Sequence, residues 1–261
     1  MRTIAVVDAN NQLHRLYHAM GAAHAARNWE RHLLAIAATI TGGDAGDVFV
    51  AFDGRRGTAW RRELVAEYKS GRAEKSAELV ELLTRAAEFA TDSGYETFNI
   101  DDAEADDVIA AVVTRHTDQR AVIISSDRDL YQLLEGGRVN QLQKYKVERG
   151  RLVDCVFYTA ADFANDYQIR PEQWPAFKAI AGDKSDGLAG VPNCGPKLAS
   201  KILSRFATLG DAIADQWNLP CTQRERIALT SAARSGYLER FESVARLRRD
   251  CLDLAFSEGG A

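Results

Sequence analysis

The sequence lacks the marks of a secreted, disulfide-bonded or membrane-spanning protein. Its four cysteines are far apart, with no C-x-x-C pair, which argues against a zinc site or a disulfide framework and suits a reducing compartment. No apolar run approaches the roughly 20 residues needed to cross a bilayer. The opening MRTIAVVDAN does not have the layout of a signal peptide. We therefore expect a cytoplasmic protein with no membrane partner.

An excess of basic charge is also missing. The chain holds 33 Lys and Arg residues against 37 Asp and Glu residues, a net charge of −4. Such a protein binds nucleic acid only through a locally basic surface. Its 261 residues, 46% apolar and 27% charged, are enough for one large domain or two small ones with a sizeable core.

Three short β-branched runs are typical of buried parallel strands: TIAVVD (3–8), VFVAFD (48–53) and AVIISSD (121–127). Helical patterns separate them, over 29–41, 77–92 and 104–116. This alternation predicts a doubly wound α/β domain with a mostly parallel sheet over residues 1–158. From about residue 159 the pattern becomes helical, which predicts a smaller all-α portion over 159–261.

Acidic residues gather where the predicted strands end. Each strand run ends in an aspartate, and the segment DDAEADD (101–107) places five acids in seven residues. A helix start accounts for one or two of them, but five would repel one another unless they are spread over a solvated surface or neutralised by a cation. In open α/β sheets the carboxyl ends of the strands form the ligand crevice. One Asp after a strand is common as a loop residue or helix cap, whereas three beside an acidic run favour a site.

Nine carboxylates are therefore candidate metal ligands: Asp8, Asp53, Glu104, Asp106, Asp107, Asp127, Asp129, Asp183 and Asp186. Mg²⁺ and Mn²⁺ prefer oxygen ligands. Nine acids exceed what one Mg²⁺ requires and suit two ions. A pair of ions about 4 Å apart is the arrangement that cleaves phosphodiester bonds.

A basic segment follows the second strand. Residues 55–75 hold seven Lys and Arg against three acids, with Trp60 and Tyr68 among them. Such a run is usually a solvated charged helix. Here aromatic residues beside phosphate-binding groups favour nucleic-acid contact, with Trp60, Arg61, Arg62 and Tyr68 as candidates.

A second candidate phosphate site lies in GLAGVPNCGPKLASKIL (187–203). A Gly/Pro-rich turn before a helix that starts near Pro196 exposes backbone N–H groups. Lys197 and Lys201 add positive charge on that side.

With these motifs in order, the chain resembles the 5′-nuclease (flap endonuclease) family. That family includes the N-terminal domain of bacterial DNA polymerase I, phage 5′-exonucleases and stand-alone bacterial homologues. The likeness covers about residues 3–210 and rests on VVDANNQLHR, AFDG…WRRELVAEYKSGR, EADD, SSDRDLYQL and GDKSDGLAGVPNCGPKLA. It implies a PIN-like nuclease core.

The resemblance implies a 5′-3′ exonuclease and structure-specific flap endonuclease that uses two Mg²⁺ or Mn²⁺ ions. Its partners would be DNA with 5′ ends, flaps or branched junctions, in replication and repair, and the protein would be a monomer. By motif position, one metal site would use Asp8, Asp53, Glu104, Asp106 and Asp107, and the other Asp127, Asp129, Asp183 and Asp186.

The resemblance also implies two DNA-binding elements. Lys69 and Arg72 match the basic residues of a helical arch (about 55–85), where Lys69 would contact the scissile phosphate and Arg15 would assist. Residues 178–206 match a helix–three-turn–helix motif that grips duplex DNA and often binds K⁺ through main-chain carbonyls. Its matching positions are Ile180, Ala181, Ala189, Val191 and Cys194 for K⁺, and Asn193, Gly195, Lys197 and Lys201 for DNA.

The chain departs from the family pattern at three places. Asn193 and Cys194 stand where Gly and an aliphatic residue are usual. SDGLAGV replaces a usual Asn-Ile-Pro, and SSDRD replaces a usual Ser-Gly-Asp-Lys-Asp. All the acids that match the family's metal ligands are kept.

Three alternatives compete with this interpretation. An aspartate-nucleophile phosphohydrolase needs a second Asp two residues after the first, and that position is Asn10. A PIN-type ribonuclease shares the acidic sheet edge, but its chain is much shorter and lacks the 187–203 element. A non-catalytic DNA-junction-binding module would have vestigial acids, against which the intact Asp183 and Asp186 argue. A metal titration with a flap substrate distinguishes these alternatives.

Overall fold

The computed structural model describes residues 2–253, which divide into two compact units. Within the described part, the first unit comprises residues 2–57, 73–159 and 248–253, and the second comprises 58–72 and 160–247. The predicted division at residue 158 treats both parts as continuous in sequence. In the structure neither unit is continuous. Residues 58–72 pack with the helical unit, and residues 248–253 pack with the sheet.

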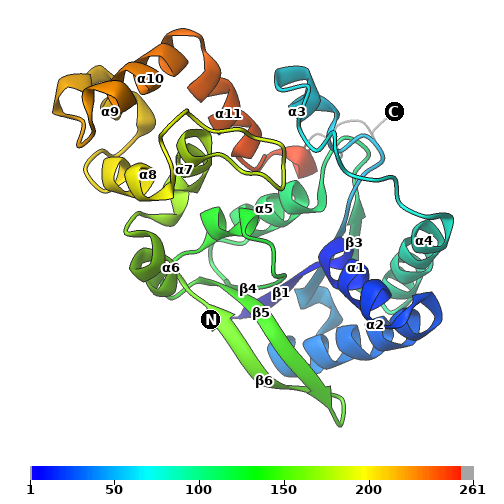
Figure 1. The fold of residues 1–261 in the computed structure, drawn as a ribbon. Coiled ribbons are helices and arrows are strands. Elements are labelled where there is room, and N and C mark those ends of the chain that lie inside the picture. The colour runs from blue at the N-terminus through cyan, green and yellow to red at the C-terminus, as the bar shows by residue number, and fades with distance from the viewer. Residues whose placement is uncertain (1, 254–261) are drawn as a thin grey trace. The chain divides into compact units, whose positions relative to one another are not determined.

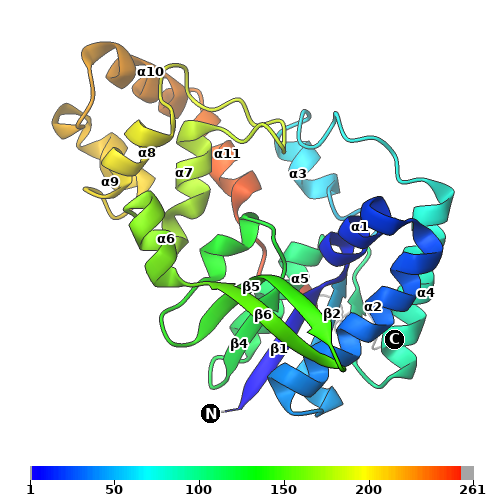
Figure 2. The same cartoon turned by 60° about the horizontal axis from the view of Figure 1, so that its bottom comes forward.

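The first unit is built on one six-stranded sheet, with strand order β3-β2-β1-β4-β5-β6 (Figure 1). Its strands are β1 Thr3–Asp8, β2 Val48–Phe52, β3 Glu96–Asn99, β4 Arg120–Ile124, β5 Val139–Glu148 and β6 Arg151–Tyr158. The pairs from β3 to β5 are parallel, and β6 pairs antiparallel with β5 at the edge (Figure 2). The prediction of a mostly parallel sheet is confirmed, and β1, β2 and β4 end along the same edge.

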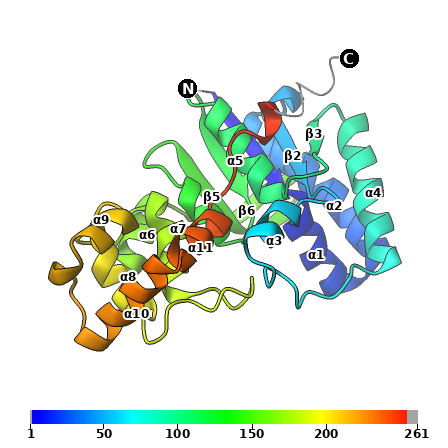
Figure 3. The same ribbon diagram turned by 90° about the horizontal axis from the view of Figure 1, so that it is seen from above.

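Helices cover both faces of this sheet. They are α1 Ala9–Met20, α2 Ala22–Ile36, α4 Ala77–Asp92 and α5 Ala105–Arg115, and a π-helical turn, Ala37–Thr41, extends α2. Because side chains alternate along a strand, Ala5 and Val7 of β1 point into the core formed with α1, α2 and α4. Figure 3 shows α5 on one side of the sheet and these three helices grouped on the other. Both layers confirm the doubly wound architecture.

The second unit is helical. It contains α3 Ala59–Leu64, α6 Ala160–Tyr167, α7 Trp174–Ala181, α8 Pro196–Leu203, α9 Leu209–Ala214, α10 Gln223–Arg234 and α11 Tyr237–Ala245. Part of its core is an aromatic cluster in which Phe163 and Trp174 meet edge to face with ring centroids 5.5 Å apart. The rings of Trp174 and Phe177 stack at 4.8 Å. The predicted helical C-terminal portion is confirmed.

Short 3₁₀ turns complete the chain, at Ala45–Asp47, Asp129–Leu133, Pro171–Gln173 and Gln216–Asn218. Over the described residues, no helix has both the length and the apolar character that crossing a membrane requires.

The segment matched to a helical arch is helical only in part. Within 55–85, α3 ends at Leu64 and α4 begins at Ala77, and the residues between them form turns and loop. Val65 has extended backbone angles, and Lys69 has a φ of 51° in the left-handed region. Both conformations are incompatible with a continuing α-helix. The basic residues Lys69 and Arg72 therefore lie on a loop.

Candidate metal centre

Three aspartates of the first unit come together at the carboxyl edge of the sheet. Asp106 lies in the first turn of α5, Asp127 follows β4, and Asp129 begins a 3₁₀ turn. Each offers one carboxylate oxygen, and these oxygens all lie within 4.8 Å of one another. Three convergent carboxylates are a donor set for a hard divalent cation. The cluster takes Asp106 from one predicted metal site and Asp127 and Asp129 from the other.

Asp8 is buried at the same edge. Its Oδ1 accepts a hydrogen bond from the Asn11 backbone N–H at 2.9 Å, which caps α1, and its Oδ2 accepts one from Ser125 Oγ at 2.7 Å. Burial raises the pKa of Asp8 to about 7, and the neighbouring charges of Asp127 and Asp53 add to the rise. A cation beside these acids would favour the ionised form of Asp8.

Asp53 lies just beyond β2 and joins three parts of the first unit. Its Oδ1 accepts from the Ala105 backbone N–H at 3.0 Å, at the start of α5. Its Oδ2 accepts from Asn10 Nδ2 at 2.7 Å and from Lys75 Nζ at 3.2 Å. A cleft of about 1080 Å³ begins at Asp53 and runs beside α4. The Asp53 carboxylate is therefore held in a fixed orientation at the mouth of a cleft.

Asp107 supports the start of α5. It is fully buried, and its Oδ1 accepts from the Arg248 backbone N–H at 2.9 Å. Its Oδ2 accepts from the Glu104 backbone N–H at 3.3 Å, which closes the first turn of α5. These contacts make Asp107 a helix cap that ties residues 248–253 to α5. They explain part of the concentration of acids in residues 101–107. Asp107 caps the helix, whereas Asp106 belongs to the carboxylate cluster.

Two glycines bring the loop after β2 against the acidic loop before α5. A Cβ atom on Gly57 would lie 2.6 Å from the Ala103 carbonyl oxygen, and one on Gly54 would overlap the Ile100 carbonyl. Backbone N–H groups bind across this contact, from Gly54 to the Ala103 carbonyl at 2.9 Å. Only glycine allows this approach, which sets Asp53 beside the N-terminus of α5.

Asp183 and Asp186 lie in the second unit, around a lysine. Lys178 Nζ is 2.7 Å from Asp183 Oδ2 and 3.9 Å from Asp186 Oδ2, and Arg72 Nη2 is 3.0 Å from Asp186 Oδ1. Burial raises the pKa of Asp183, but the Lys178 charge and hydrogen bonds from Lys178 and Ser185 outweigh it and lower the pKa to about 2. Asp183 is therefore ionised at neutral pH.

The loop that carries Lys69 packs on the Asp186 turn. The Lys69 backbone N–H donates to the Asp186 carbonyl at 3.0 Å. Gly187 has a φ of 76°, and a Cβ there would lie 2.7 Å from the Glu67 carbonyl oxygen. These contacts place the backbone of Lys69, a residue that is only 7% exposed, and the side chain of Arg72 beside Asp186. Arg15, on α1 in the first unit, contacts the Gln143 carbonyl at 3.5 Å.

Two of the predicted DNA-binding residues are buried. Arg61 is 2% exposed, and its Nε donates to the Val244 carbonyl at 2.9 Å. Its guanidinium also lies 4.4 Å from the centre of the Trp60 ring, and Tyr68 is 3% exposed. Arg61 and Tyr68 therefore lie in the interior of the second unit rather than on its surface, and Arg61 joins α3 to α11. Arg62 is exposed, and its Nε donates to the Tyr68 carbonyl at 3.2 Å.

The segment predicted as a helix–three-turn–helix is a helix, a loop and a helix: α7, residues 182–195 and α8. Gly182 and Gly190 cross in the loop, where a Cβ on Gly190 would lie 2.5 Å from the Gly182 backbone nitrogen. Of the predicted K⁺ ligands, the Ile180 carbonyl accepts the Val191 N–H at 2.8 Å, and the Val191 carbonyl accepts the Cys194 N–H at 3.0 Å.

The turn at Asn193 and Cys194, where the sequence departs from the family pattern, has the left-handed backbone conformation that glycine favours. Asn193 has a φ of 65°, and Asn adopts this left-handed conformation more readily than most residues. Cys194 is buried, with its Sγ 3.9 Å from the Glu225 carbonyl, so it fills the place of a small apolar residue. Asn193, Gly195, Lys197 and Lys201 are all exposed, as duplex contacts must be.

Three residues of the candidate site were not predicted. Lys178 could have been found, because a single cation in the otherwise apolar helix WPAFKAIA suggests an acidic partner. Ser125 and Asn10 carry no comparable signal. Their importance comes from hydrogen bonds to Asp8 and Asp53, which lie 117 and 43 positions away in sequence.

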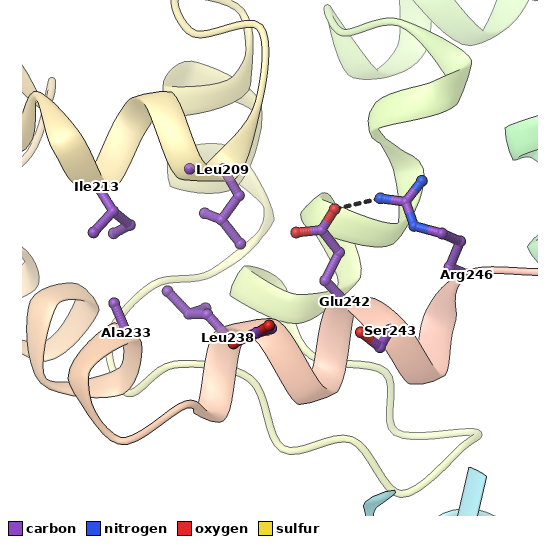
Figure 4. A pocket seen from close by; sticks show the side chains of 9 residues that line it. Leu209, Ile213, Ala233, Leu238, Glu242, Ser243 and Arg246 are labelled. Carbon is purple, nitrogen blue, oxygen red and sulfur yellow. Dashed lines mark hydrogen bonds and ion pairs between the residues drawn. The ribbon is translucent and has the colours of Figure 1, made fainter. Parts of the chain in front are cut away.

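A cavity of about 430 Å³ in the second unit contains none of the predicted site residues. Leu209 and Ile213 of α9, Ala233 of α10 and Leu238 of α11 line it, with the Glu242–Arg246 ion pair at its edge (Figure 4). Apart from Glu239, Ser243 and this ion pair, the lining is apolar.

Comparison with known protein families matches both parts of the chain. Residues 3–168 match the model of the 5′-3′ exonuclease N-terminal resolvase-like domain, and residues 169–258 match that of the 5′-3′ exonuclease C-terminal SAM fold. Both matches follow the order along the chain expected from the sequence motifs.

Curated relatives agree with these models. A 5′-3′ exonuclease from Halalkalibacterium halodurans is 35% identical over 165 residues, 62% of this chain and 52% of the relative. The chain thus spans about half the length of the first curated relatives it matches. The flap endonuclease Xni of Photobacterium profundum is 30% identical over 97% of this chain and 94% of its own length.

Solved structures share the fold. The T5 5′-exonuclease with bound divalent zinc superimposes with a TM-score of 0.78 and 25% identity, over 97% of this chain and 92% of that one. A bacteriophage T5 flap endonuclease in a pseudo-enzyme-product complex with DNA and metal ions gives a TM-score of 0.75 at 25% identity, over 99% of this chain and 94% of that one.

Proposed function

The chain belongs to the 5′-3′ exonuclease family, and we propose that it hydrolyses phosphodiester bonds of DNA at 5′ ends and at flaps, with two divalent metal ions. The observation that carries this proposal is the convergence of Asp106, Asp127 and Asp129 within 4.8 Å. Three carboxylates at the carboxyl edge of a parallel sheet are costly to hold together without a cation. The donors are all oxygen, which suits Mg²⁺ or Mn²⁺.

The acids divide into ligands and supports. Asp106, Asp127 and Asp129 would hold a divalent ion, and Asp8, Asp53 and Glu104 would contribute charge at the same edge. Asp183 and Asp186 would serve the second ion, with Lys178 and Arg72 as their ion-pair partners. When bound, such ions activate water and stabilise the leaving oxygen. Asp107 would act by capping α5, the helix that carries Asp106.

The basic groups would bind DNA through its phosphates. Lys69 and Arg72 lie on a loop whose backbone is hydrogen-bonded to Asp186, so they would contact the scissile phosphate. Asn193, Gly195, Lys197 and Lys201 are exposed at the turn before α8 and on that helix, where they would contact duplex phosphates without reading bases.

Four finer features complete the proposal. A K⁺ ion would bind at main-chain carbonyls near Ala181 and Ala189, where the glycine crossing brings two backbone segments together. The protein would act as a monomer, in DNA replication and repair. It would work in the cytoplasm, as four unpaired cysteines suit a reducing compartment.

A metal titration with a 5′-flap duplex tests the proposed activity. Mg²⁺ or Mn²⁺ should support cleavage, whereas Ca²⁺, which is larger and less strictly coordinated, should not. Asp127→Asn should lower single-turnover cleavage about a hundredfold or more, comparable to the loss of one transition-state charge stabiliser. The matched control is Asp118→Asn, an exposed acid on a turn of the same unit. Full activity in excess EDTA, or in Asp127→Asn, would contradict the proposal.

A further inference from the structure

The second unit carries an exposed tryptophan that the proposed function does not use. Trp217 is 75% exposed, more than any other large apolar side chain in the described part of the chain. It lies in the short 3₁₀ turn Gln216–Asn218, between α9 and α10. Exposing an indole forgoes the apolar burial that normally stabilises this residue in a core. Its position therefore points to a binding role.

The Trp217 ring is held by a cation. The Arg226 guanidinium, on the first turns of α10, lies 4.8 Å from the centre of the indole. A guanidinium over the ring covers one face, and the high exposure of Trp217 leaves the other face to solvent. The indole is thus a fixed, flat, apolar surface beside a positive charge.

A groove of about 510 Å³ continues from this turn. The loop Leu219–Thr222 forms one wall with Glu225, and Lys197, Leu198 and Lys201 of α8 form the other. Because Lys197 and Lys201 are four residues apart on a helix, their side chains lie on the same face. Both are exposed, as is Arg224 near the start of α10.

The acids of this surface are turned towards their own neighbours. Glu225 Oε2 accepts the Thr222 backbone N–H at 2.7 Å, and this hydrogen bond lowers the pKa of Glu225. Asp215 Oδ1 accepts from Asn218 Nδ2 at 2.8 Å. The cations at 197, 201, 224 and 226 thus outnumber the acids at 215 and 225.

We propose that Trp217, Arg226, Lys197 and Lys201 form a binding surface for single-stranded DNA. An unpaired base stacks on the open face of Trp217, and the phosphates beside it contact the two lysines along the groove. Base stacking on an aromatic ring beside phosphate-binding cations is how proteins hold single strands without reading sequence. A duplex keeps its bases paired and stacked, so it can use the lysines but not the indole. The proposed nuclease function enters this inference only in the choice of DNA as ligand.

Tryptophan fluorescence tests this surface without any catalysis. The full chain is titrated with an oligothymidylate in EDTA, and the emission of its four tryptophans is followed. Trp29 and Trp174 are buried and Trp60 is partly buried, so a quench on binding reports mainly on Trp217. We expect a quench in the natural chain and none in Trp217→Ala.

Variants give the affinity change. Trp217→Ala should weaken oligothymidylate binding at least about fivefold, because one stacked base is lost, and Trp217→Phe should retain part of the affinity. Binding of a blunt duplex should change less than about twofold. Ile227→Ala is the matched control. Ile227 is 59% exposed on α10 and follows Arg226 in sequence, so this variant removes exposed apolar surface while the indole is kept.

Three results would overturn the proposal. The first is that Trp217→Ala binds oligothymidylate as tightly as the natural chain does. Trp217 would then be a contact for another macromolecule. The second is an equal loss for oligothymidylate and blunt duplex, and the third is an equal loss in Ile227→Ala. A failure of metal-dependent flap cleavage would contradict the proposed nuclease function but not this inference. The fluorescence titration requires no catalysis, so its result would still apply.

Discussion

The buried Lys178 and the partly buried Asp183 form an ion pair in the second unit, with the ammonium nitrogen 2.7 Å from Asp183 Oδ2. Lys178 projects from α7, and Asp183 lies in the turn that follows this helix. The same ammonium is 3.9 Å from Asp186, so one cation serves two of the carboxylates that we assign to metal binding. A built-in positive charge thus lies between two acids that would otherwise repel each other, and it lowers the pKa of Asp183.

We expect Lys178→Met to destabilise the second unit by about 3 kcal/mol, because removing one partner leaves buried carboxylate charge uncompensated. Urea unfolding at neutral pH measures the change. Lys184→Met is the control, since Lys184 is exposed in the same turn and should cost less than about 1 kcal/mol. Equal effects of the two variants would show that the buried pair does not stabilise the fold.

The Asp183 pKa predicts a pH dependence of stability. In the folded chain it is about 2, below its ordinary value of 3.8. Its contribution, about 2 kcal/mol, is therefore present above about pH 4 and is lost as the pH falls towards 2. The stability difference between the natural chain and Asp183→Asn should shrink between pH 5 and about pH 3 in urea unfolding. A constant difference over this range would contradict the shift.

Asp8 should behave in the opposite sense. Burial raises its folded pKa to about 7, so folding favours the protonated form, and stability is lost as the pH rises from about 4 through 7. In EDTA, the natural chain should lose stability relative to Asp8→Asn over this range, by at most about 4 kcal/mol. Saturating Mg²⁺ should reduce the loss. Parallel stability curves for the two proteins in EDTA would show that Asp8 is not perturbed.

Arg61 and Arg62 are neighbours with different predicted effects. Arg61→Ala should destabilise the second unit by about 2–3 kcal/mol, because a buried guanidinium that binds the Val244 carbonyl is lost. Arg62→Ala removes an exposed side chain and should cost less than about 1 kcal/mol. Thermal unfolding measures both. If Arg62→Ala were the more destabilising variant, the assignment of Arg61 to the core would be wrong.

Asn193 tests whether the altered turn depends on its backbone conformation. With φ at 65°, Asn193→Gly should be tolerated, whereas Asn193→Val should destabilise the turn by about 1–2 kcal/mol. Duplex binding in Ca²⁺ should follow the same order, because the turn precedes the lysines of α8. If the two variants unfolded and bound duplex identically, the left-handed conformation at residue 193 would not limit the stability of the turn.

Much of the candidate site could be predicted because its signals are local. The runs at 3–8, 48–53 and 121–127 form parallel strands, as β-branched runs separated by helical patterns should. Acids placed just after parallel strands must meet at one edge, and Asp127 meets Asp106 there. The motif order indicated the family that both domain models match.

The sequence by itself therefore determined the sheet, the acidic edge and the family, since each depends on periodicity or on order along the chain. Only the tertiary structure decided what individual charges do. Asp107 caps α5 at Glu104 and also holds the backbone of residue 248, Arg61 is buried against α11, and Lys178 pairs with Asp183. A carboxylate or guanidinium has the same identity in the sequence whether it faces solvent, a backbone group or an opposite charge. Its role is set by neighbours that are distant in the chain or brought close by a turn, because hydrogen bonds and ion pairs act only over a few ångströms.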